Sequence, residues 1–206
     1  MPKKGFFISF EGIEGSGKST QIKLLAKYLR KSGDKTQVLW EPGATEIGEE
    51  IRKILLSPDH KNMTDETELL LYLAARAQMV REKVLPALHQ KKIIISDRFF
   101  DSTFVYQGYG AGLDVKTIKK INDFALAGVC PDLTILLDLP VEQGLKRCQR
   151  ADRIEKKNVK FHQRVRAGYL KLAKQFPKRI KIVKVNCSIE EVQEKIREVV
   201  GGCLGI

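Results

Sequence analysis

The chain has 206 residues, enough for one well-buried domain and short for two. Hydrophobic residues make up 43% and charged residues 30%, as in an ordinary soluble globular protein. Lysine and arginine outnumber aspartate and glutamate by 37 to 25, which gives a net charge of +12. These positive residues are spread along the chain, and no basic arm or helix collects them, so the charge does not require a nucleic-acid partner.

The cysteines and the N-terminus indicate a cytoplasmic protein without a membrane anchor. The four cysteines form no C-x-x-C pair and the three histidines have no metal-ligand spacing, so reduced thiols are expected. The first apolar stretch ends at Phe10, too short for a signal peptide or a membrane span. The last four residues resemble a prenylation box, but Gly205 is a poor aliphatic residue there, and no lipid anchor is expected.

Short apolar runs alternate with longer amphipathic segments, which predicts parallel βαβ units and an α/β fold. The predicted strands are 6–10, 36–40, 93–96, 133–139 and 180–185, and the predicted helices lie near 19–32, 46–56, 66–90, 115–127, 141–149, 158–175 and 189–199. The helix over 66–90 should bend at Pro86. No repeat or linker interrupts the chain, so 1–206 is expected to form a single domain.

A phosphate-binding loop lies between the first predicted strand and the first predicted helix. The segment Gly12–Ser19 has the pattern G-x-x-x-x-G-K-S/T, in which glycines let backbone N–H groups face one anion-binding concavity. Lys18 can reach the β- and γ-phosphates, and the Ser19 hydroxyl can join the shell of a Mg²⁺ ion. We therefore predict a nucleoside triphosphate site formed by Gly12, Ile13, Glu14, Gly15, Ser16, Gly17, Lys18, Ser19 and Thr20.

Two charged segments follow later strands. Asp97 and Arg98 come directly after the strand 93–96, at the sheet edge where ligands bind in doubly wound folds. Asp97 can bind a water molecule of a hydrated Mg²⁺ ion, and Arg98 can clamp a phosphate with two parallel hydrogen bonds. The alternative is a structural ion pair at the start of a helix. The segment 147–157 is either an exposed polar loop or a mobile lid whose arginines close over the triphosphate.

Taken together, these motifs resemble the thymidylate kinase family over essentially the whole chain. The resemblance rests on the segments 10–20, 41–45, 76–78, 97–108 and 152–155, which occur in the family's order. It implies a three-layer P-loop kinase fold with a five-stranded parallel sheet, helices on both faces and a small lid at about 147–157. It also implies transfer of the ATP γ-phosphoryl group to dTMP, a step in dTTP synthesis, with a Mg²⁺ requirement. A homodimer formed by helix packing is expected, without nucleic-acid or membrane partners.

The same resemblance implies an acceptor site. Arg98 would grip the dTMP phosphate, Arg76 would bond the thymine edge, and Glu14 would accept a hydrogen bond from the 3′-OH. Tyr72 stands where the family usually has a phenylalanine stacked on thymine, and a core aromatic is the alternative. The further residues implied at this site are Pro42, Ser102, Thr103, Gln107 and Tyr106, the last against the sugar where a ribose 2′-OH would project.

Catalysis is expected to depend on aligning the two substrates and neutralising the charge of the phosphates, without a general base. Lys18 and Arg98 are predicted to be catalytic, together with Arg150 or Arg153 from the lid. Gly15, with Arg147 as a further lid arginine, matches the family branch that carries its catalytic arginines in the lid. Trp40 and Ala44 depart from the family pattern. The alternatives are a kinase for another nucleoside monophosphate or deoxynucleoside and, from another class, a nucleic-acid-dependent P-loop ATPase.

Overall fold

The computed structural model describes residues 5–148 and 152–205. Its centre is a five-stranded sheet in the order β2-β3-β1-β4-β5, with each neighbouring pair parallel. The strands are β1 (Phe6–Glu11), β2 (Thr36–Trp40), β3 (Ile93–Asp97), β4 (Leu133–Asp138) and β5 (Ile180–Lys184). The predicted parallel sheet is confirmed, and no strand boundary differs from the prediction by more than one residue.

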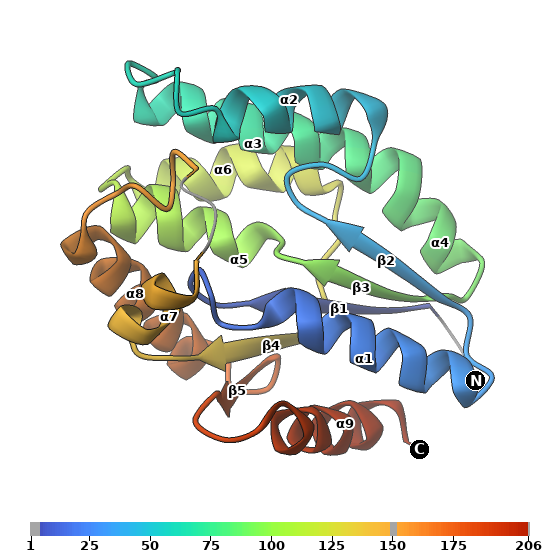
Figure 1. The fold of residues 1–206 in the computed structure, drawn as a ribbon. Coiled ribbons are helices and arrows are strands. Elements are labelled where there is room, and N and C mark those ends of the chain that lie inside the picture. The colour runs from blue at the N-terminus through green and yellow to red at the C-terminus, as the bar shows by residue number, and fades with distance from the viewer. Residues whose placement is uncertain (1–4, 149–151, 206) are drawn as a thin grey trace.

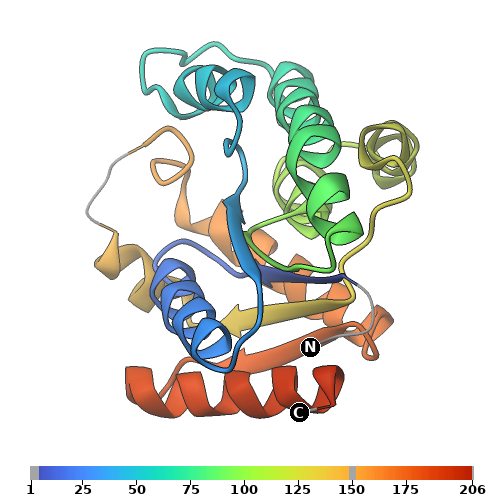
Figure 2. The same ribbon diagram turned by 90° about the vertical axis from the view of Figure 1, so that its right-hand side faces the viewer.

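Helices cover the sheet on both faces, as predicted. They are α1 (Lys18–Lys31), α2 (Glu46–Leu56), α3 (Asp65–Met79), the π-helical η1 (Val80–Val84), α4 (Leu85–His89), α5 (Phe100–Thr103), the π-helical η2 (Phe104–Gly110), α6 (Val115–Leu126), α7 (Val141–Arg147), α8 (Val159–Gln175) and α9 (Ile189–Leu204). Figures 1 and 2 show α1 and α9 together on one face of the sheet, with α3, α4 and α6 on the side of the other face.

Alternate residues of the central strands pack into the two helical layers. Ile8 is fully buried in a cluster with Leu25 of α1 and Ile196 of α9, whereas its neighbour Phe7 is buried in a cluster with Met79 of α3. Because both faces of these strands are covered, they are continuously apolar, as parallel strands usually are.

Two predicted helices differ from the observed ones in their interior or end. The helix predicted over 66–90 is divided by the π-helical turn η1 just before Pro86, a residue without an N–H whose ring crowds the carbonyl four residues earlier. The helix predicted to end at 199 continues through two glycines to Leu204, which packs against the core, and ends at Gly205 in the left-handed conformation.

Within the described residues, 5–148 and 152–205, no helix has both the length and the apolar character that crossing a bilayer requires.

Candidate active site

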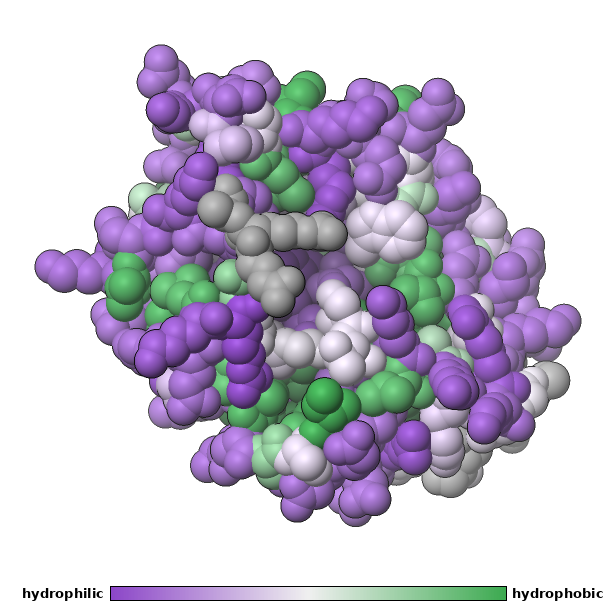
Figure 3. Space-filling model, in the orientation of Figure 1, coloured by the Kyte–Doolittle hydropathy of each residue, from purple (hydrophilic) through white to green (hydrophobic). Residues whose placement is uncertain are grey.

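A cavity of about 740 Å³ opens at the carboxyl ends of β1, β2 and β3. Its walls come from the phosphate loop, the segment after β2, helix α3, the segment after β3, and the chain following residue 151. Figure 3 shows a hydrophilic hollow near the middle of this face. The predicted site residues that line the cavity are Glu14, Gly15, Lys18, Ser19, Pro42, Tyr72, Arg76, Asp97, Arg98, Ser102, Thr103, Tyr106 and Gln107.

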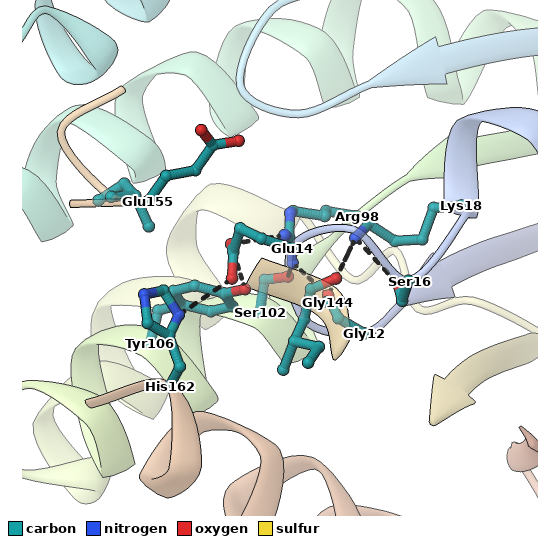
Figure 4. Close-up of polar contacts among 12 residues, drawn as sticks. Gly12, Glu14, Ser16, Lys18, Arg98, Ser102, Tyr106, Gly144, Glu155 and His162 are labelled. Atoms are coloured by element: carbon teal, nitrogen blue, oxygen red, sulfur yellow. Dashed lines mark hydrogen bonds and ion pairs between the residues drawn. The ribbon is translucent and has the colours of Figure 1, made fainter. Parts of the chain in front are cut away.

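The phosphate loop closes around the Lys18 ammonium group. Nζ donates hydrogen bonds to the carbonyls of Gly12 at 3.0 Å and Ile13 at 2.9 Å, and Ser16 Oγ lies 3.4 Å away. Figure 4 shows the lysine reaching back over the loop. Gly17 adopts the left-handed conformation at the start of α1, so the helix N-terminus opens into the loop.

Burial lowers the pKa of Lys18 to about 8, and the neighbouring Arg98 charge acts in the same direction. A buried cation of this kind is stabilised by an anion placed beside it. The loop is therefore arranged to receive a negatively charged group, as its sequence predicts. Thr20 lies exposed in the first turn of α1, beside Ser19.

Gly15 is required by a close approach of two backbones. Its φ is +69°, and a Cβ at this position would collide with the backbone carbonyl of Gly144 in α7. No side chain can be accommodated there without moving α7. An arginine at this position of the loop is therefore excluded on steric grounds.

Glu14 is held by three side chains from different elements. Its Oε1 accepts hydrogen bonds from Arg98 at 2.9 Å and from the Tyr106 hydroxyl at 2.6 Å, while His162 Nδ1 of α8 lies 3.2 Å from Oε2 (Figure 4). Burial alone would raise the pKa of Glu14, but the contact with His162 and the charges of Arg98 and Lys18 lower it to about 2. The carboxylate is thus ionised and fixed toward the cavity.

Glu14→Gln is expected to reduce the loss of stability that the protein suffers at acidic pH. The pKa of Glu14 falls from 4.5 to about 2 in the folded protein. Its ionised form therefore stabilises the fold above pH 4.5, and this contribution is lost as the pH falls toward 2. Denaturant unfolding from about pH 6 to about pH 3 should show a larger loss in the parent protein than in Glu14→Gln. Glu194→Gln, at an exposed carboxylate of α9, is the control. If the free energy of unfolding fell equally with pH in the parent protein and in Glu14→Gln, the lowered pKa of Glu14 would be contradicted.

Ser19 and Asp97 meet at the mouth of the loop. The Ser19 hydroxyl donates to Asp97 Oδ2 at 2.9 Å, so a hydroxyl and a carboxylate oxygen lie together beside the phosphate loop. Among residues 5–148 and 152–205, no group of three or more histidine, cysteine, aspartate or glutamate side chains could hold a metal. A hydroxyl and a carboxylate oxygen suit Mg²⁺, which usually takes few protein ligands and completes its shell with water and substrate phosphates.

Arg76 is almost fully buried and forms hydrogen bonds with side chains of two other segments. The guanidinium is 1% exposed, donates to both carboxylate oxygens of Glu41 at 2.7 Å, and donates to Asn122 at 2.7 Å. Each terminal nitrogen still has a second hydrogen, because a guanidinium carries five in total. Tyr72 lies one turn earlier on α3 and lines the same wall. This ion pair was missed because Glu41 is separated from Arg76 by 35 positions.

Of the predicted lid arginines, Arg153 is not brought to the phosphate loop. Arg153 NH2 pairs with Glu68 Oε2 at 2.6 Å, and its Nε donates to the Leu55 carbonyl at 2.9 Å, so it points toward α2 and α3. The second oxygen of Glu68 accepts from Gln107 at 2.7 Å. Arg150 lies outside the described residues. The role of either arginine in transfer stays a prediction.

The comparisons with known proteins agree with this geometry. The family model for thymidylate kinase matches residues 10–196. A thymidylate kinase of Kosmotoga olearia is 48% identical, with 92% of each chain covered, and one of Geotalea uraniireducens is 50% identical, with 93% of this chain and 94% of the relative covered. The crystal structure of thymidylate kinase from Ehrlichia chaffeensis superposes with a TM-score of 0.81 at 33% identity, covering 96% of this chain and 99% of that one.

The parallel sheet, the phosphate loop after β1 and the cavity beside it define a P-loop kinase, an ATP-dependent phosphotransferase. The chain belongs to the thymidylate kinase family.

Proposed function

We propose that the protein transfers the γ-phosphoryl group of ATP to dTMP, giving dTDP and ADP. The observation that carries this proposal is the continuity of the cavity, which has the phosphate loop at one end and the Tyr72–Arg76 wall of α3 at the other. A donor triphosphate and an acceptor monophosphate bound at these ends would meet between Lys18 and Arg98, which both line the cavity. Holding two reactants in line accounts for a large part of phosphoryl-transfer catalysis.

In this proposal the donor side consists of the loop amides and Lys18 around the β- and γ-phosphates. Ser19 and Asp97 would hold Mg²⁺, which would supply positive charge to neutralise the donor phosphates. On the acceptor side, Arg98 grips the dTMP phosphate. No general base is needed, since a phosphate oxygen of dTMP is already anionic.

The nucleoside would lie along α3 and η2. Arg76 bonds the thymine edge, Tyr72 stacks on the base, and Glu14 accepts from the 3′-OH. The remaining contacts are assigned to Pro42, Ser102, Thr103, Tyr106 and Gln107, all of which line the cavity. For Arg153 to act on the phosphates it must leave Glu68.

A panel of phosphoryl acceptors in a coupled ADP assay tests the proposal. dTMP is expected to give the highest kcat/KM among dTMP, dUMP, UMP, dCMP, AMP, GMP and thymidine. A different best acceptor would favour another nucleoside monophosphate kinase or a deoxynucleoside kinase. ATP hydrolysis that requires DNA or RNA and weakens steeply with salt would favour a nucleic-acid-dependent ATPase.

Tyr106→Ala is expected to erode discrimination between dUMP and UMP. The ring is buried, and the Arg98 guanidinium lies 4.9 Å from its centroid, so it forms a rigid wall beside Glu14. The ratio of the two kcat/KM values should fall by about tenfold, because an apolar wall rejects one added hydroxyl only moderately. Tyr106→Phe keeps the wall, loses the hydrogen bond to Glu14, and should keep the discrimination. An unchanged ratio in Tyr106→Ala would remove this residue from sugar selection.

We also propose a cytoplasmic homodimer. Phe124 of α6 is 82% exposed and Leu70 of α3 is 55% exposed, and these two helices pack against each other. Large exposed apolar side chains on adjacent helices support association through this surface. All four cysteines are free thiols, which supports a reducing compartment. Light scattering of the parent protein and of Phe124→Glu would test the dimer, which the variant should dissociate.

A further inference from the structure

We propose that Tyr169, anchored by the buried carboxylate of Glu11, positions the Arg98 guanidinium for the acceptor phosphate. The inference rests on the role proposed above for Arg98. Neither Glu11 nor Tyr169 belongs to the set of residues expected to touch a nucleotide, and neither lines the cavity. They would therefore act as positioning residues and not as catalytic ones.

Glu11 is the centre of a fully satisfied hydrogen-bond network at the end of β1. The residue is 0% exposed. Its Oε1 accepts from the Ser9 hydroxyl at 3.0 Å and from the Phe99 amide at 2.8 Å. Its Oε2 accepts from the Ser102 hydroxyl at 2.6 Å and from the Tyr169 hydroxyl at 2.9 Å. A buried carboxylate with four donors is a rigid anchor.

Tyr169 links this anchor to Arg98. The Arg98 NH1 group donates to the Tyr169 hydroxyl at 3.1 Å and to the Gly12 carbonyl at 2.9 Å. A guanidinium can only donate, so the Tyr169 oxygen must accept from Arg98. Its single hydrogen is then directed toward Glu11, either to Oε2 itself or through the Ser102 hydroxyl 2.7 Å away, which donates to the same oxygen. The direction of the chain is therefore fixed from Arg98 through Tyr169 to Glu11. The bond from Arg98 to Tyr169 is donated by a charged group, which makes it stronger than a neutral one.

The network also fixes the backbone on which Arg98 is mounted. Arg98 has a φ of +70°, a left-handed conformation that costs energy for a residue with a side chain. Glu11 holds the amide of the next residue, Phe99, while the Arg98 amide itself donates to the Phe10 carbonyl at 2.9 Å. The strained turn is thus held on both sides of the α-carbon.

The charge of Glu11 depends on these donors. Burial, and the nearby carboxylate of Asp101, raise the pKa of Glu11 to about 7, while the Ser102 hydroxyl, Arg98 and the Tyr169 hydroxyl lower it from what burial alone would give. Removing the Tyr169 hydroxyl would therefore take away the acceptor that faces Arg98. It would also raise the pKa of the Glu11 carboxyl behind it.

Tyr169→Phe tests the proposal, because it removes one hydroxyl and keeps the ring that packs edge-on against Tyr106. Titration calorimetry should show dTMP affinity weakened by about tenfold, the size of one hydrogen bond to a charged group. Affinities for thymidine, which has no phosphate, and for ATP should be unchanged. Glu11→Gln is a second variant with the same expected pattern. Tyr28→Phe, which removes a tyrosine hydroxyl on α1 outside this network, is the control and should leave all three affinities unchanged.

The Arg98→Ala background separates positioning from a general loss of structure. If Tyr169 acts through Arg98, then Tyr169→Phe should cause no further loss of dTMP affinity in that background. A further loss there, or an equal loss for dTMP and thymidine, would overturn the proposal. Unchanged dTMP affinity in Tyr169→Phe, beside weakened binding in Arg98→Ala, would overturn only the positioning role. Unchanged binding in Arg98→Ala would overturn the proposed role of Arg98 itself.

Discussion

Lys18→Ala is expected to lower kcat for phosphoryl transfer by about 10²–10³-fold, the effect of removing one preorganised electrostatic contact to the reacting group. The ammonium group is buried inside the loop, where it is held by two backbone carbonyls. An alanine leaves the loop amides in place but removes the full positive charge. Coupled ADP assays at saturating ATP and dTMP measure the change.

The control for this experiment is Lys27→Ala, on the same helix but exposed to solvent. It should have near-parental activity, and thermal unfolding should show that both variants are folded. Because Lys18 is a buried cation with a pKa lowered to about 8, its removal is not expected to unfold the protein. Near-parental turnover in Lys18→Ala would refute its role in holding the donor phosphates.

Arg98→Ala is expected to reduce kcat/KM for dTMP on the order of 10²–10³-fold, the loss of about two hydrogen bonds to a charged phosphate. The guanidinium is already oriented by Glu14, Gly12 and Tyr169, so it offers the acceptor a preformed site. KM for ATP should change little, because the donor phosphates are assigned to the loop and to Lys18. Steady-state kinetics with each substrate varied in turn measure the split.

Arg98→Lys distinguishes charge from geometry. A lysine keeps the positive charge but cannot form two parallel hydrogen bonds, so it should recover only part of the lost activity. Arg81→Ala, at an exposed arginine of η1, is the control for a change in net charge. If Arg98→Ala raised KM for ATP and dTMP equally, a specific role at the acceptor phosphate would be contradicted.

The contacts of Arg153 bear on how the predicted catalytic role of the lid arginines should be tested. In this structure its guanidinium is paired with Glu68 of α3 and bonded to the Leu55 carbonyl of α2. The same Glu68 holds Gln107, so one buried carboxylate joins the segment after residue 151 to η2. The kinetic contributions of Arg150 and Arg153 should therefore be measured separately, by single alanine variants of each.

The sequence alone was sufficient to predict the features that depend on residues close together in the chain. Each strand is a short apolar run because both faces of a covered parallel sheet are buried, and such a run is visible without knowing its partners. The phosphate loop is likewise local: its glycines, Lys18 and Ser19 lie within eight consecutive positions, 12–19. This explains why the sheet could be predicted closely and why the sequence alone leads to a donor-site prediction.

The helical segment formed by α5 and η2 was not predicted as a helix. Its sequence, from Phe100 to Gly110, has three aromatic residues besides Phe100 and two glycines, and most of its side chains are buried. A helix buried on nearly all sides has no polar stripe, so the usual 3.6-residue periodicity is missing. Its conformation is instead decided by tertiary packing against α8, α6 and α3.

What the tertiary structure decided is the choice of partner for each charged group. The Glu11–Tyr169 bond spans 158 positions, the Arg76–Glu41 pair spans 35, and Arg153 could be placed beside Glu68 only once α3 and the chain after residue 151 were folded together. The sequence determined which groups carry charge and which backbone segments bind phosphate. Their pairing depends on distances of about 3 Å between elements remote in the chain, and only the packed fold sets such distances.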